Sequence, residues 1–163
     1  MIITTDDFRG EANIPGMAPA LGTVGPANEV VRSRVQAFID RYEPKFLRMF
    51  YGGDEGKATA LLDYAGKPEA ARTSRSRNAL LEALKEPLAR YVAFHFLRHC
   101  TIANTPIGGV VQQGENGRRD NTSELTLRLW NGMADDCLAV HESLVGGEIP
   151  QTEIFEHVNA LNL

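Results

Sequence analysis

Residues 91–97, "YVAFHFL", are the stretch on which the predicted fold depends, because nearly every position carries an apolar or aromatic side chain. A helix that is hydrophobic all round in a soluble protein lies in the middle of a bundle. Leucines at 80, 81, 84 and 88 share one face at about 100° per residue and extend this helix back to Ser76 or Asn78. The segment is therefore predicted to be the central helix, with an interruption at Glu86-Pro87.

Further helices are predicted on both sides of this central helix, because apolar residues recur at three- and four-residue steps. Their predicted landmarks are an N-cap at Asn28, a kink or restart at Pro44, an N-cap at Asp54, an N-cap at Thr122 or Ser123, and an end at Gly146-Gly147. "MIITT" at residues 1–5 predicts a short strand, and residues 10–27 predict a long loop. The fold class is thus mainly α, a helical bundle of about four to five helices.

Composition places the chain among ordinary globular proteins. Its 163 residues, 43% hydrophobic and 23% charged, are enough for a single domain over residues 1–163 with one core. No run of eighteen apolar residues and no charged-apolar-small leader is present, so we expect a soluble protein that is not secreted and has no membrane partner. Cys100 and Cys137 are then expected to stay reduced.

Charge is unevenly distributed along the chain. The net charge of -4 argues against a protein built to grip nucleic acid, because such binding relies on Lys and Arg. Residues 129–163 carry six carboxylates and no Lys or Arg, whereas residues 1–128 sum to +2. Arginines cluster in "RTSRSR" at residues 72–77 and at Arg118-Arg119. These groups are either solvated loops or the two sides of a contact between subunits.

The segment 104–121 joins the last two long helices and is much longer than a turn. It contains "IGGVVQQGENGRR", in which Val and Gln lie between glycines, and no phosphate-loop spacing is present. This composition predicts a protruding β-like arm, and an exposed strand pairs readily with a neighbour's backbone. The tail 147–163 has apolar residues but too few to bury them alone. Arm and tail together indicate self-assembly.

The residues predicted to form an oligomer or partner interface come from the arm, the arginine clusters and the tail. They are Gly108, Gly109, Val110, Val111, Gln112, Gln113, Arg118 and Arg119 in the arm; Arg72, Arg75 and Arg77; and Ile154, Phe155 and Glu156 in the tail.

Two histidines and a Cys-His pair have the spacing of metal ligands on helices. His95 and His99 are four residues apart, as are Cys137 and His141, and four such ligands suit zinc. If the two helices pair in antiparallel fashion, about twelve residues, or roughly 18 Å, separate the pairs. We therefore expect no metal, cofactor or catalytic site, and a His95 satisfied by a core hydrogen bond. A helical-bundle metal-binding protein or enzyme using His95 and His99 stays open as an alternative.

Several stretches occur in an order that is familiar from one protein family. They are "MIITTDDFRGE" (1–11), "FIDRYEPKFLRMFYG" (38–52), "YVAFHFLRH" (91–99), "IGGVVQQGENGRR" (107–119), "LRLWNGM" (127–133) and "IFEHVNALN" (154–162). With them the chain resembles the small helical head-tail connector, or head completion, proteins of tailed bacteriophages and prophages. The segment "HCTIAN" (99–104), where the predicted arm begins, departs from that pattern.

This resemblance implies a structural protein that forms a homo-oligomeric ring between the portal and the tail and completes the DNA-filled head. The implied partners are further copies, the portal and tail-completion proteins, and DNA that passes through the channel without specific binding. The implied location is the virion, with assembly in the host cytoplasm. Against this stands a second alternative, a DNA-packaging or regulatory module that binds DNA through the arginine clusters.

Overall fold

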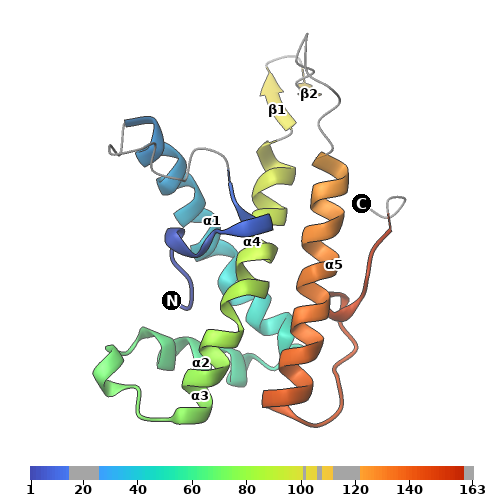
Figure 1. The fold of residues 1–163 in the computed structure, drawn as a ribbon. Coiled ribbons are helices and arrows are strands. Elements are labelled where there is room, and N and C mark those ends of the chain that lie inside the picture. The colour runs from blue at the N-terminus through green and yellow to red at the C-terminus, as the bar shows by residue number, and fades with distance from the viewer. Residues whose placement is uncertain (15–25, 101, 106–107, 112–121, 160–163) are drawn as a thin grey trace.

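The computed structural model describes residues 1–14, 26–100, 102–105, 108–111 and 122–159. Within these residues the chain forms a bundle of α-helices (Figure 1). The helices are α1 (Pro26–Phe50), α2 (Glu55–Gly66), α3 (Arg75–Ala83), α4 (Lys85–Cys100) and α5 (Thr122–Val140), and α5 runs on into a π-helical turn, His141–Val145. Short 3-10 turns lie at Thr5–Asp7, Gly10–Ala12, Glu69–Ala71 and Glu153–Phe155. The prediction of a mainly α-helical bundle is confirmed.

Helix α4 is the central helix, as its apolar sequence predicts. It lies beside α5 and runs antiparallel to it, and α1 packs on its other side (Figure 1). Phe94 of α4 contacts Trp130 of α5 at 5.0 Å between ring centroids, and one turn earlier Arg90 lies beside Asp136. Val92 and Ala93 have no exposed surface. Burial of this all-apolar stretch supplies much of the hydrophobic free energy of the fold.

The start of α2 matches the predicted cap at Asp54, whereas α3 is capped by Ser74, two residues before the predicted Ser76, and α1 begins at Pro26, two residues before the predicted Asn28. Asp54 caps α2 by accepting the Lys57 N–H at 3.0 Å, and Ser74 caps α3 by accepting the Arg77 N–H at 3.4 Å. The helix predicted after Ser76 is interrupted, as expected, but the break lies at Leu84, two residues before the predicted Glu86-Pro87, and separates α3 from α4. Pro87 lies in the first turn of α4, where a missing N–H leaves no helical bond unmade. Pro44, in contrast, lies inside a continuous α1.

The N-terminal segment is not the strand that "MIITT" predicts. Thr4 forms a reciprocal cap with Asp7, whose carboxylate accepts the Thr4 N–H at 2.7 Å, and this cap starts a 3-10 turn. Ile3 is fully buried, and the carboxylate of Glu43 in α1 accepts the N–H of Ile2. The segment needs no partner strand, because a helix side chain satisfies its backbone. Residues 15–25 of the predicted loop lie outside the described residues.

A two-stranded antiparallel hairpin follows α4 at the end of the bundle (Figure 1). Strand β1 (Ile102–Thr105) pairs with β2 (Gly108–Val111), with Ile102 opposite Val111 and Thr105 opposite Gly108. The hairpin begins before the predicted arm, and residues 106–107 and 112–121 lie outside the described residues. The arm predicted over 104–121 is therefore not confirmed. Gln112, Gln113, Arg118 and Arg119 of the predicted interface also fall outside them.

The tail does not need a partner to bury its apolar residues, so that prediction was wrong. After Gly146-Gly147 the chain turns back and runs along α5 (Figure 1). Ile154 is fully buried, and Phe155 is 9% exposed. The chain buries them because the end of α1 and one side of α5 form a groove of matching apolar character. Among the helices described, none combines the length and the apolar character that a membrane crossing requires.

Candidate functional site

The structure assigns the predicted interface arginines at 72–77 two kinds of environment. Arg72 donates from Nη2 to the Ala65 carbonyl at 2.6 Å and from Nε to the Lys67 carbonyl at 2.9 Å. These bonds satisfy carbonyls at the end of α2, so Arg72 is occupied within its own chain. Arg75 and Arg77 are exposed at the start of α3, although the Arg77 guanidinium lies 5.3 Å from the Tyr64 ring centroid. Two of the three arginines are thus available at the surface.

The predicted interface residues of the tail are also divided. Phe155 packs against Phe50 at 5.9 Å and against His141 at 5.7 Å between ring centroids, and Ile154 is enclosed beside it. In this conformation their own chain encloses both residues, and their role at an oligomer or partner interface stays a prediction. Glu156 keeps an exposed side chain. It belongs to a set of exposed carboxylates at this end of the chain, namely Glu142, Glu148, Glu153 and Glu156.

His95 is held by aromatic rings. Its imidazole stacks on Tyr42 at 4.1 Å with an angle of 12° between the planes, and it meets Tyr91 edge-on at 4.5 Å. Its Nε2 is buried and has no hydrogen-bond partner among the residues described, so the predicted core hydrogen bond at this atom is wrong. Burial, with smaller contributions from the nearby Arg98 and Lys45 cations, lowers the pKa of His95 to about 4.

The other metal-ligand types lie in separate places. His99 is exposed and contacts Phe38, Cys137 is fully buried in the core, and His141 lies between Phe50 and Phe155. Because Arg90 lies beside Asp136, the adjacent Cys137 lies toward the opposite end of α4 from His95 and His99. The part of the chain that the structure describes holds no group of three or more His, Cys, Asp or Glu side chains able to bind a metal ion.

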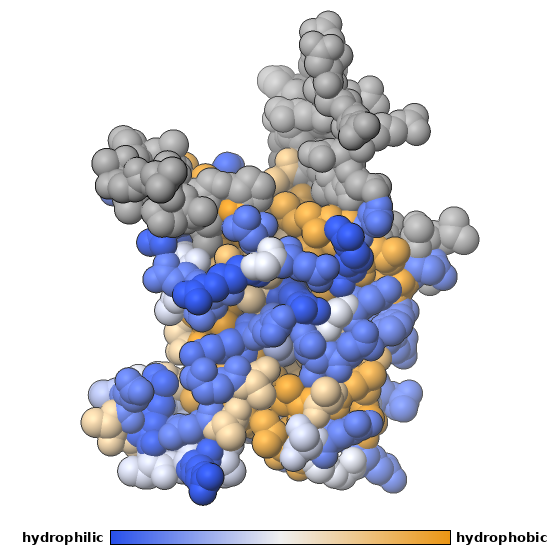
Figure 2. Space-filling model, in the orientation of Figure 1, coloured by the Kyte–Doolittle hydropathy of each residue, from blue (hydrophilic) through white to orange (hydrophobic). Residues whose placement is uncertain are grey.

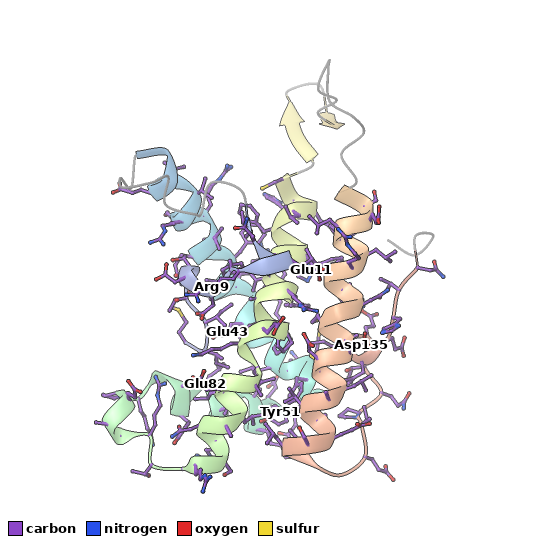
Figure 3. The ribbon with its side chains drawn as sticks, in the orientation of Figure 1. Arg9, Glu11, Glu43, Tyr51, Glu82 and Asp135 are labelled. Carbon is purple, nitrogen blue, oxygen red and sulfur yellow. The ribbon has the colours of Figure 1, made fainter. Side chains whose placement is uncertain are left out.

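A shallow hollow of about 330 Å³ lies between the N-terminal segment and the first turns of α4. Hydrophilic residues form a broad band on this face (Figure 2), and Arg9 and Glu11 lie on the segment that crosses α4 (Figure 3). The cations that line the hollow already have partners. Arg9 Nε donates to the Asp6 carbonyl at 3.0 Å, and Lys85 Nζ lies 2.7 Å from Glu82. The exposed Lys85–Glu82 ion pair contributes little to the free energy of unfolding, and neither contact by itself defines a ligand site.

Arg90 forms the most internal charge contact of this hollow. Its guanidinium bonds Glu86 at 2.7 Å and lies 3.5 Å from Asp136 of α5. Burial raises the pKa of Asp136, and the Arg90 cation partly offsets that effect. Gly132 makes this arrangement possible, because a Cβ atom there would overlap the guanidinium. The contact therefore joins α4 to α5 and has a structural role.

Two structurally important contacts were missed by sequence reasoning. Glu43 is 5% exposed and holds the N-terminal segment, and burial raises the pKa of its carboxyl. A signal for it exists, because Glu43 falls on the apolar face defined by Ile39 and Phe46. The second is the set of polar groups on α5 that hold the tail. The Asn131 amide exchanges hydrogen bonds of 2.9 and 3.1 Å with the backbone of Val158.

Comparisons of the chain with models of protein families, with curated proteins and with solved structures found no match. The features that can carry a function are therefore those of its own geometry. They are the hairpin at the end of the bundle, the exposed arginines of α3, the exposed carboxylates of the C-terminal segment, and the groove that holds the tail.

Proposed function

We propose that this chain is a structural assembly protein of the kind that its sequence resembles, a head-tail connector of a tailed phage or prophage. Copies associate into a ring between portal and tail and complete the DNA-filled head. The observation that carries the proposal is the hairpin β1–β2, which leaves the bundle where a short turn would join α4 to α5. The proposed place of action is the virion, reached from the host cytoplasm.

The hairpin supports the proposal because a bundle of this kind does not need it. A two-stranded hairpin is marginally stable alone, and its outer edges offer backbone N–H and C=O groups for pairing. Pairing with a strand of a neighbouring subunit or of the portal satisfies these groups. The residues that follow β2 in the sequence continue the predicted arm with Gln112, Gln113, Arg118 and Arg119.

The distribution of exposed charge also supports self-association. Arg75 and Arg77 are exposed at the start of α3, and Glu142, Glu148, Glu153 and Glu156 are exposed near the C-terminal end. Opposite charges on two regions of one chain favour a head-to-tail contact between copies, and such contacts form a ring when the rotation between neighbouring copies closes. The net charge of -4 suits a channel wall, because a wall that binds phosphates weakly lets DNA slide.

The test replaces residues 107–119 with a short Gly-Ser linker in a phage that encodes the chain. We expect the variant to keep its helical content and its melting temperature, because α4 ends and α5 begins outside the replaced range. We expect it to lose the joining of tails to heads, which electron microscopy of lysates would record as filled capsids without tails.

A Gly-Ser insertion of the same length at Gly53 serves as the matched control, because Gly53 is exposed and no atom lies within 4 Å of a Cβ built there. This control should complete heads. Normal tailed particles from the arm variant would contradict the proposal, and early unfolding of that variant would instead make the replaced residues part of the core.

A further inference from the structure

The chain after Gly147 forms a strap over the bundle, here named the C-terminal strap (residues 149–158). Its apolar anchors are Ile154 and Phe155, which enter the groove between the end of α1 and α5. Pro150 marks its start by packing on Gly52, where an added Cβ would come within 2.6 Å of the proline ring. Thr152 Oγ1 then donates to the Met49 carbonyl of α1 at 3.1 Å.

Polar side chains of α5 bind the main chain of the strap. Trp130 Nε1 donates to the Glu156 carbonyl at 2.8 Å, and Asn131 both accepts from and donates to the backbone of Val158. A reciprocal amide contact of this type holds an extended segment at one register, as an added strand is held. One side-chain pair completes the set, His157 Nε2 with Asp135 Oδ1 at 2.7 Å, and Asp135 lies on the side of α5 that faces the strap (Figure 3).

The strap is joined to the bundle by two successive glycines. Gly146 and Gly147 have φ angles of +72° and +84°, both are exposed, and no atom lies within 4 Å of a Cβ built at either. Glycine adopts both signs of φ with similar ease, so rotation at this pair redirects the strap without a steric barrier. The strap therefore has the properties of an exchangeable element: a flexible joint, two apolar anchors, and contacts that do not depend on which chain supplies it.

We propose that the groove also binds the C-terminal strap of a second copy of this chain, so that neighbouring subunits are linked by exchanged straps. Each exchanged contact is chemically identical to the contact within one chain, which makes exchange a low-cost route to association. In dilute solution the tether gives a subunit's own strap the higher effective concentration and the closed form dominates. When subunits are held side by side, the effective concentration of the neighbour's strap at a groove becomes similar to that of the subunit's own strap. The inference rests on the proposed self-assembly and names one contact within it.

The test uses two full-length variants in a Cys100→Ser background, which removes the exposed native thiol. One carries Asp135→Cys and the other His157→Cys, and both positions are more than half exposed, so folding should tolerate the changes. The two proteins are mixed at high concentration, incubated, oxidised and separated on a denaturing gel without reductant. A disulfide between them forms when the strap of one chain occupies the groove of the other. We expect a covalent dimer whose yield rises with protein concentration.

Two matched controls define the outcome. A Glu124→Cys variant places an exposed thiol at the other end of α5, and its mixture with the His157→Cys variant measures random collision. A chain with both Asp135→Cys and His157→Cys measures closure within one chain. A dimer yield several-fold above the collision control supports exchange. A yield equal to that control, under conditions in which the doubly substituted chain closes its own disulfide, overturns it.

Light scattering of the unmodified protein separates this inference from the proposed function. Oligomers that form while the cysteine pair stays at the collision level would show that subunits associate without strap exchange. A chain that stays monomeric at all concentrations and forms no cross-linked dimer would contradict both the exchange and the proposed self-assembly.

Discussion

At the scale of single residues, His95 shows what an aromatic cluster does to a titratable side chain. Its ring is stacked on Tyr42, and its pKa is lowered from the ordinary 6.5 to about 4. The unfolded chain therefore takes up this proton first as pH falls. The contribution of neutral His95 is fully present above pH 6.5 and is lost as pH falls toward about 4.

We expect His95→Phe to retain the ring contacts and to remove this part of the pH dependence. His95→Ala should lower the free energy of unfolding by about 1 to 3 kcal/mol, because it opens a cavity between the rings. Urea unfolding of the wild type and of both variants between pH 4 and 7 measures the effect. His99→Phe is the control, because His99 is exposed. Parallel pH profiles for the wild type and His95→Phe would contradict the expectation.

The contribution of Glu43 to the free energy of unfolding changes with pH in the opposite direction. Burial raises the pKa of its carboxyl above the ordinary value of 4.5, so the native state holds the proton after the unfolded state has lost it. The contribution to stability is fully present below pH 4.5 and is reduced as pH rises through the raised native pKa. We expect Glu43→Gln to remove this decrease while its amide oxygen still accepts the Ile2 N–H.

Thermal unfolding of Glu43→Gln over the same pH series measures this difference, with the exposed Glu69→Gln as the control. Glu43→Ala should be worse than Glu43→Gln by about 1 to 3 kcal/mol, because the backbone N–H of a buried segment loses its acceptor. Equal pH profiles for wild type and Glu43→Gln would mean that groups other than Glu43 cause the pH dependence of stability.

At the scale of elements, the C-terminal strap depends on α5 for its position. We expect Asn131→Ala to remove both bonds to Val158 at a cost of about 1 to 2 kcal/mol for local opening, while α5 stays helical. Trp130 reports the change, because it is the single tryptophan and its indole N–H binds the strap. Its emission should shift to longer wavelength and the strap amides should exchange faster.

Glu142→Ala is the control for this variant, because Glu142 is exposed in the turn that follows α5. Unchanged emission and unchanged exchange in Asn131→Ala would mean that Ile154 and Phe155 hold the strap without the amide contact. A helix cap such as Asp54 acts on neighbouring residues, whereas the strap needs a groove that two helices form together.

At the scale of the whole molecule, charge should govern association between copies. The carboxylates at 142, 148, 153 and 156 and the guanidinium groups of Arg75 and Arg77 are exposed, so salt screens their attraction. We expect the mass measured by light scattering to fall between low and moderate salt. Charge reversal at Arg75 and Arg77 to Glu should lower it at low salt, with Lys67→Glu on α2's end as the control. A mass that is constant or grows with salt would count against a charge-led contact.

By itself the sequence determined the helices of this protein. The apolar face of α1, the nearly all-apolar stretch of α4 and the cap at Asp54 are local patterns, because helix formation couples residues only three or four positions apart. The same locality explains the error at "MIITT", because a short β-branched stretch has no local reason to prefer a strand over a capped turn. The break between α3 and α4 also has a local signal, Pro87, and lies two residues before the predicted position.

Only the tertiary structure decided where the tail goes and which polar groups are used internally. Thr152 and Met49, joined by one hydrogen bond, are 103 positions apart, and Ile154 is buried only because α1 and α5 together form a groove. Burial in such a groove depends on surfaces from distant segments, which no local period encodes. Packing likewise brings the N-terminal backbone to Glu43 and places Asp136 of α5 3.5 Å from Arg90, and neither contact follows from a local pattern.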